Sequence, residues 1–146
     1  MTDTPAQTVV LLPIKPRFAK PILGGLKRVE FRKKRFARRP SHVVVYASSP
    51  VKKVVGFFEV SDLETAPIRE LWRRYESSGG IQAAEFFEYY GSGREGVAIS
   101  VGRVTVLAEP MELAELGLGE RPPQNYAYVE PAVLVQLLVA ARSCAS

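Results

Sequence analysis

The basic segment from Lys15 to Arg39 limits most strongly how this chain can fold. It contains eleven of the twenty Lys and Arg residues and a single acid, Glu30. From residue 27 its apolar residues recur with a period of two, which predicts a strand with Val29 and Phe31 on one face. Charged side chains occupy the other face, so the chain must place charge on a strand that also contributes to the core.

The charged row of this strand consists of Arg28, Glu30 and Arg32, a carboxylate between two guanidinium groups. Pairing with either arginine would keep Glu30 ionised and orient the cation toward a ligand. The alternative is a surface ion pair worth less than about 1 kcal/mol. The following residues, 33–39, are too basic for a core strand and are expected to form a mobile cationic rim. Phe36 would either anchor this rim or stack on a base.

The charge of the chain is unevenly distributed. From residue 41 to the C-terminus, nine basic residues stand against thirteen acids, so the net charge of +5 conceals a strong asymmetry. A segment as basic as 15–39 attracts polyanions, and the phosphate backbone of a nucleic acid is the first partner to consider. The alternatives are a solvated basic face without a ligand and a contact surface for an acidic protein.

The composition predicts one globular domain spanning residues 1–146, with a flexible N-terminus at 1–7. A single cysteine, Cys144, and a single histidine, His42, exclude an intrachain disulfide and argue against a zinc site, so we expect no metal or cofactor. The N-terminus lacks a secretory signal pattern, and the longest apolar stretch, 132–141, is too short to cross a bilayer. A cytoplasmic protein without membrane contact is therefore expected.

Hydrophobic periodicity predicts a mixed α+β fold. Strands are expected at 8–14, 27–32, 42–50, 51–64, 96–107 and 126–129, and helices at 16–23, 67–76, 82–91 and from 131 onward. The strand at 42–50 is apolar on both faces, as in a small closed barrel. Gly56 suggests a bulge or a tight bend in its strand, and Gly102 marks a bend in the strand at 96–107. The C-terminal helix and tail, 131–146, are apolar on nearly all faces of the helix; we expect packing on the domain and leave a homodimer through this helix open.

Three stretches in this order resemble one family. They are LLPIKPRFAKPILGG, then G-x-K-x-x-E-x-R at residues 25–32, then the strand pair VVVYASSP and VVGFFEV. Together they resemble the ASCH domain of the PUA-like superfamily over roughly residues 8–129, and PPQNYAY is similar to the closing segment of its stand-alone prokaryotic members. The resemblance implies a small PUA-like β-barrel of about five to six strands, with short flanking helices and a C-terminal helix.

The resemblance also implies a cleft that binds nucleic acid, with RNA favoured over DNA. Carried over by position, Lys27, Glu30 and Arg32 would line the cleft, Lys15 would lie at its mouth, and Tyr46 and Ser48 would lie on the neighbouring strand. With the adjacent cations, the candidate nucleic-acid-binding residues are Lys15, Lys27, Arg28, Glu30, Arg32, Lys33, Lys34, Arg35, Tyr46 and Ser48.

An enzyme is the alternative, since some small ASCH proteins are amidohydrolases acting on acetylated cytidine and others are described as ribonucleases. The amidohydrolase pattern has Thr where this chain has Glu30, so that hydroxyl is missing, although Ser48 or Ser100 could substitute. In an enzyme, Lys27 and Glu30 would act as acid/base or electrostatic stabiliser without a metal. Strict strand alternation opposes this, because it separates Lys27 from Glu30 unless Lys27 precedes the regular strand.

Overall fold

The computed structural model describes residues 7–143, with side chains as far as residue 141. The expected flexible N-terminus, apart from Gln7, and the end of the predicted C-terminal tail lie outside these residues. The strands are β1 (Val9–Ile14), β2 (Val29–Arg32), β3 (His42–Ala47), β4 (Lys53–Pro67), β5 (Glu95–Met111) and β6 (Ala127–Val129). The helices are α1 (Pro16–Leu23), α2 (Ile68–Tyr75), α3 (Ala83–Tyr90), the 3-10 turn η1 (Leu113–Leu116) and α4 (Ala132–Ser143).

The six strands form one sheet in the order β2-β5-β4-β3-β1-β6. β1 runs parallel to β3, and every other neighbouring pair is antiparallel. The α+β class and the number of strands are confirmed. The sheet is not closed into the predicted barrel, because within residues 7–143 no backbone ladder joins the edge strands. A side chain of β2 spans the gap instead: the Arg32 guanidinium donates a hydrogen bond of 3.0 Å to the carbonyl of Pro13 in β1.

The central strands are buried on both faces, as the two apolar rows of 42–50 predict. On one face, Val43 and Val45 pack with residues of β1, α1 and β5. On the other face, Val44 and Tyr46 pack against α4 through a cluster that includes Leu137. The sheet therefore separates two hydrophobic cores. Val43 and Val45 of β3 belong to one core, and Val44 and Tyr46 belong to the other, because successive residues of a strand point to opposite faces.

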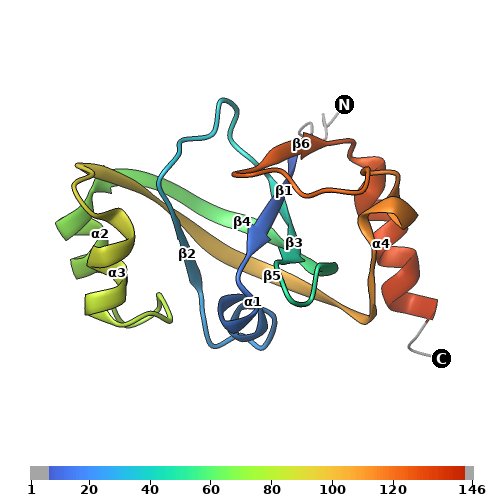
Figure 1. The fold of residues 1–146 in the computed structure, drawn as a ribbon, viewed down its shortest axis with the longest axis horizontal. Coiled ribbons are helices and arrows are strands. Elements are labelled where there is room, and N and C mark those ends of the chain that lie inside the picture. The colour runs from blue at the N-terminus through green and yellow to red at the C-terminus, as the bar shows by residue number, and fades with distance from the viewer. Residues whose placement is uncertain (1–6, 144–146) are drawn as a thin grey trace, which may run out of the picture.

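The long strands β4 and β5 run the length of the molecule and carry α2 and α3 at their far end (Figure 1). The β4–β5 register shifts beside Gly56, where a Cβ atom would collide with the carbonyl of Thr105, and a Cβ on Gly102 would lie 2.9 Å from the carbonyl oxygen of Glu59. At the α2/α3 end, Phe86 of α3 packs on Phe31 of β2, with ring centroids 4.8 Å apart, so the helices support the strand that carries the charged row.

Helix α4 packs on its own sheet, which confirms that expectation. Val133, Leu134 and Leu137 are buried, whereas Val135 and Val139 are about 60% exposed on the opposite side. A homodimer through this helix stays a prediction. Within residues 7–143, no helix combines the length and the apolar character needed to span a bilayer.

Candidate functional site

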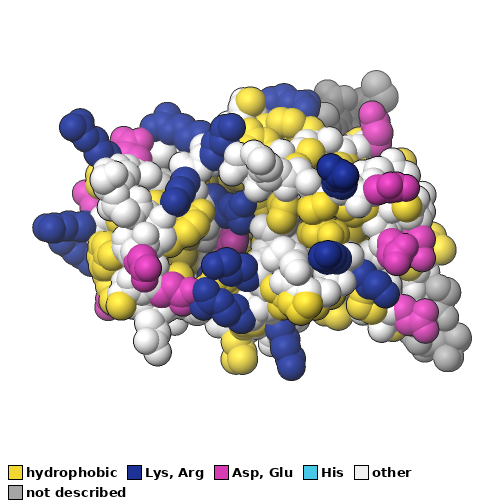
Figure 2. All heavy atoms as spheres, in the orientation of Figure 1, with side chains coloured by type: hydrophobic (Ala, Val, Ile, Leu, Met, Phe, Trp, Pro, Cys, Tyr) yellow, Lys and Arg dark blue, Asp and Glu magenta, His cyan; other side chains and the backbone are white. Residues whose placement is uncertain are grey.

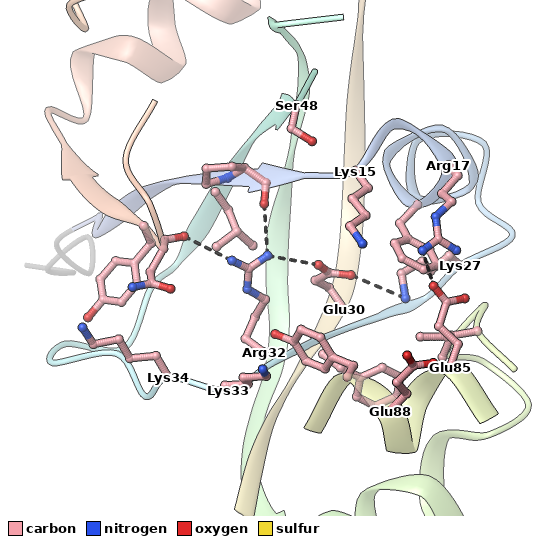
Figure 3. A pocket seen from close by; sticks show the side chains of 18 of the residues that line it. Lys15, Arg17, Lys27, Glu30, Arg32, Lys33, Lys34, Ser48, Glu85 and Glu88 are labelled. Atoms are coloured by element: carbon pink, nitrogen blue, oxygen red, sulfur yellow. Dashed lines mark hydrogen bonds and ion pairs between the residues drawn. The ribbon is translucent and has the colours of Figure 1, made fainter. Parts of the chain in front are cut away.

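A pocket of about 690 Å³ opens between β2 and β1, where the sheet is not closed (Figure 3). Most of its lining comes from four parts of the chain: β1 with α1, β2 with the residues on either side of it, α3, and the segment before β6. Ser48 after β3 and Ile81 before α3 complete it. The lining residues are Leu12, Pro13, Lys15, Arg17, Phe18, Lys27, Glu30, Phe31, Arg32, Lys33, Lys34, Phe36, Ser48, Ile81, Glu85, Glu88, Tyr89, Asn125 and Tyr126.

Three charged side chains form a row in the pocket, with Glu30 between Lys27 and Arg32 (Figure 3). The Lys27 ammonium lies 3.5 Å from Oε1 of Glu30, and Nη1 of Arg32 lies 3.4 Å from Oε2. We call these three residues the ionic row. Lys27 reaches Glu30 because the regular strand begins only at Val29, so alternation does not apply to it. Lys27 therefore precedes the regular strand, which is the one case in which the sequence allows it to meet Glu30.

Lys27 is almost fully buried, with 2% of its surface exposed. Its ammonium donates a hydrogen bond to the carbonyl of Gly79 and lies 5.1 Å from the ring centroid of Phe18 and 5.3 Å from that of Phe31. Burial lowers the pKa of Lys27, and the nearby carboxylate of Glu30 opposes that shift only in part. The pocket thus holds an amine that gives up its proton more readily than an exposed lysine.

Arg32 is held by backbone carbonyls on two other parts of the sheet. Its Nη1 donates to Pro13 at 3.0 Å and its Nη2 to Asn125 at 3.2 Å. Of the two arginines that sequence reasoning offered as partners for Glu30, Arg32 is therefore the correct one. Arg28 points away: it is exposed and does not line the pocket.

The mouth of the pocket is rich in cations, and Figure 2 shows Lys and Arg side chains gathered around a hollow on this face. Six Lys or Arg side chains line the pocket against three carboxylates. We call Lys15, Lys33 and Lys34 the cationic mouth; within the described residues none of the three forms an ion pair. Arg17 is different, because it pairs with Glu85 and holds the pKa of that carboxyl below its usual value.

The basic loop after β2 is tethered, in contrast to the mobile rim predicted for residues 33–39. The Tyr126 hydroxyl donates to the carbonyl of Arg35 and accepts from the amide of Ala37, each at 3.3 Å. The Tyr128 hydroxyl donates to the carbonyl of Arg38 at 3.0 Å and accepts from its amide at 2.6 Å. We call these two side chains the tyrosine clamp. Their spacing predicts that they share one side of the extended segment at 126–129, but only the structure shows that they bind the backbone of the basic loop.

Removing both hydroxyls of the tyrosine clamp, in Tyr126→Phe/Tyr128→Phe, is expected to speed tryptic cleavage in the basic loop severalfold. Each hydroxyl bond contributes about 0.5–1.5 kcal/mol, and loss of both raises the population of locally open loop. Limited proteolysis followed by mass spectrometry measures this. Tyr75→Phe is the matched control, because its hydroxyl bonds to Glu64 on β4. Equal cleavage of the loop in both variants would show that the clamp does not restrain it.

Three predicted site residues do not reach the pocket. Arg28 is exposed, Arg35 pairs with Glu95 at 2.5 Å outside the lining, and Tyr46 is buried in the core beneath α4 with 4% exposure. Tyr46 lies on the opposite face of β3, because Val43 and Val45 are the residues of that strand that face the pocket side of the sheet. Lys15, Lys27, Glu30, Arg32, Lys33, Lys34 and Ser48 do line the pocket.

Sequence reasoning missed the wall that α3 contributes. Glu85, Glu88 and Tyr89 line the pocket, while Phe86 and Tyr90 of the same helix are buried in the core. The helical period separates these two faces, since residues three and four apart lie together. It does not indicate that the polar face meets β2. Phe36 acts as an anchor, with its ring centroid 4.6 Å from that of Tyr126.

Known proteins match this chain over most of its length, although no protein-family model matches it. It is 28% identical over 133 residues to an ASCH domain-containing ribonuclease of Zymomonas mobilis, which covers 88% of this chain and 89% of the relative. The crystal structure of ASCH from Zymomonas mobilis superposes with a TM-score of 0.79 and 26% identity, over 90% of this chain and 93% of that one.

A more distant structure shares the fold alone. The N-terminal domain of Staphylothermus marinus McrB aligns with a TM-score of 0.54 at 10% identity, over 95% of this chain and 98% of that one. The two Zymomonas mobilis matches span most of both chains, in sequence and in fold. The chain is thus similar to ASCH domain proteins both in sequence and in fold.

Proposed function

We propose that this protein binds RNA, with an unpaired nucleotide in the pocket and its flanking phosphates at the cationic mouth. The observation that carries the proposal is the combination of unpaired Lys15, Lys33 and Lys34 around a pocket with aromatic walls and a charged floor. Lysines hold phosphates without regard to sequence, and aromatic rings such as Phe18 and Tyr89 stack on bases. The volume of the pocket lies within the range typical of sites for small ligands.

RNA is favoured over DNA by the way such a pocket would be filled. A base must leave its stack to enter, and proteins that recognise RNA by sequence mostly bind loops, bulges and ends whose bases are already unstacked. The Zymomonas mobilis relative is described as a ribonuclease, which supports an RNA ligand for this chain as well.

The variant Lys15→Ala/Lys33→Ala/Lys34→Ala is expected to bind single-stranded RNA about a hundredfold more weakly at ~0.1 M salt. Each phosphate contact on a single strand adds about 0.7 to the slope of log K against log salt, so losing three contacts removes about two decades at that concentration. Fluorescence anisotropy with a labelled RNA, repeated over a range of salt, measures both the affinity and the slope.

The matched control is Lys20→Ala/Lys52→Ala/Arg103→Ala, which removes the same charge from exposed positions outside the pocket. It is expected to keep most of the affinity and of the salt slope. An affinity independent of salt, or an equal loss in both triple variants, would overturn the proposed function.

The second candidate is a ribonuclease, favoured by the description of the Zymomonas mobilis relative and by the adjacency of Lys27 and Glu30. The ribose 2′-oxygen would attack the phosphorus and the bond from phosphorus to O5′ would break, leaving a 2′,3′-cyclic phosphate and a 5′-hydroxyl. The Glu30 carboxylate would take the 2′-hydroxyl proton, and the Lys27 ammonium would give a proton to O5′. Burial, by lowering the pKa of Lys27, favours that role as an acid.

Hydrolysis of acetylated cytidine would need a hydroxyl nucleophile in the pocket. Ser48 lines it, whereas Ser100 on β5 does not. No contact of Ser48 within the described residues links it to Lys27 or Glu30, so this activity stays a prediction from the resemblance.

A further inference from the structure

We infer that the pocket selects guanine among the RNA bases, read by the ionic row. This inference rests on the proposed RNA-binding function and goes beyond it, because phosphate contacts and stacking carry no base preference. The row presents its hydrogen-bonding groups in a fixed order: a donor on Lys27, two acceptors on Glu30, and a donor on Arg32.

The two cations lie beside different oxygens of the same carboxylate, which gives the row its order (Figure 3). The separations of 3.5 and 3.4 Å are longer than the roughly 2.7–2.9 Å of strong charge-assisted hydrogen bonds. A carboxylate offers about four lone-pair positions, so both oxygens of Glu30 keep capacity for donors of a ligand. The cations hold the carboxylate in place without using up its acceptors.

The cations also keep free donors. The Lys27 ammonium has three N–H groups, of which the carbonyl of Gly79 and the Glu30 carboxylate take two. The Arg32 guanidinium has five, of which the carbonyls of Pro13 and Asn125 and the Glu30 carboxylate take three. Each end of the row can therefore donate to an acceptor on a ligand.

Among the four RNA bases, only guanine has two adjacent donors flanked by acceptors. Its edge presents O6, N1–H, N2–H₂ and N3, which is acceptor, donor, donor, acceptor, the complement of the ionic row. Adenine and cytosine each carry a single donor group on that edge, and uracil has only N3–H between two carbonyls. Any of these three would leave a Glu30 oxygen facing an acceptor or unpaired in a mostly buried site, which costs binding free energy.

Two aromatic rings of the pocket, Phe18 and Tyr89, can stack on the base that the ionic row binds. Phe18 of α1 lies beside Lys27, and the Lys33 ammonium lies 4.8 Å from the ring centroid of Tyr89 on α3. Rings of this kind stack on every base, so they add affinity without preference. The selectivity is thus assigned to Glu30 and its two flanking cations.

The test compares short oligouridine RNAs that carry one central guanosine, inosine, 7-deazaguanosine, adenosine or cytidine, bound to the wild-type protein. Inosine differs from guanosine only by lacking N2–H₂, so its binding is expected to be about tenfold weaker or more, as for the loss of one bidentate base contact. 7-Deazaguanosine lacks N7, which the row does not use, and should bind like guanosine. Equal affinity for guanosine and inosine overturns the inference and leaves RNA binding intact, whereas absence of binding to every RNA overturns the proposed function as well.

A variant provides the second measurement. Glu30→Gln replaces one acceptor by a donor and is expected to bind the guanosine and inosine RNAs within about twofold of each other. Glu109→Gln is the matched control, because it removes the same charge from an exposed residue outside the pocket and should keep the preference. Thermal unfolding establishes that Glu30→Gln is folded, and the comparison of the RNAs on the wild type does not depend on it. Full guanine preference in Glu30→Gln would also overturn the inference.

Discussion

The variant Glu30→Ala is expected to lower the free energy of unfolding by about 3–5 kcal/mol, the range measured when one partner of a buried ion pair is removed. Glu30 is 6% exposed and Lys27 2% exposed, so little water would replace the lost carboxylate. The Lys27 ammonium would keep the carbonyl of Gly79 and two aromatic rings but would lose the carboxylate with which it forms an ion pair. Urea unfolding followed by circular dichroism measures the change.

Two comparisons separate this effect from a general loss of charge. Glu88→Ala removes an exposed carboxylate of the same pocket and is expected to change stability by no more than about 0.5 kcal/mol. The double variant Lys27→Met/Glu30→Leu replaces the buried pair by apolar groups of similar size and should recover much of the loss. A loss below about 1 kcal/mol in Glu30→Ala would show that water reaches the ionic row and solvates it.

Cleavage of RNA, the second candidate activity, is expected to fall by about 10²- to 10⁴-fold in Lys27→Met, the usual contribution of a positioned acid. Methionine has a similar length and fills the space between Phe18 and Phe31, but it has no proton to give to the leaving oxygen. Single-turnover cleavage of a labelled RNA at saturating protein measures the chemical step apart from binding.

The dependence on pH has a defined sign. As an acid, Lys27 must be protonated, so the rate should fall as the pH rises through its pKa, which burial has moved below 10.5. Lys15→Met is the control: it loses a cation of the mouth, so it should weaken binding but leave the saturated rate and its pH dependence nearly unchanged. Equal saturated rates for wild type and Lys27→Met would reject Lys27 as the acid.

Recognition of guanine and cleavage of RNA would each use the free lone pairs of Glu30, but for different groups of the RNA. Glu30 cannot accept from N1–H and N2–H₂ of guanine and from a ribose 2′-hydroxyl in the same complex, because both need its free lone pairs. A cleaving complex would place the ribose, instead of the base, against Glu30. The comparison of guanosine with inosine therefore decides between the two uses of the same three residues.

Hydrophobic pattern alone determined much of the scaffold. The two apolar rows of β3 predict burial on both faces, which the structure confirms. Gly56, predicted to mark a bulge or a tight bend, lies at a shift of the β4–β5 register. The period of two at residues 29–32 correctly separates Val29 and Phe31, which face the helices, from Glu30 and Arg32. These features are local, so a few neighbouring residues are enough to specify them.

The tertiary structure decided which distant side chains meet. The tyrosine clamp, the wall from α3 and the carbonyl of Asn125 at Arg32 join residues that are about 60–90 positions apart in the chain, and no period relates such residues. Tyr46 lies on the face of β3 that packs beneath α4, although the sequence predicted that it lies beside the pocket. The sequence by itself determined that Lys27, Glu30 and Arg32 lie within six residues of one basic segment. Only the open edge between β2 and β1 decided that they line a pocket, because strands joined there by a backbone ladder would leave no room for one.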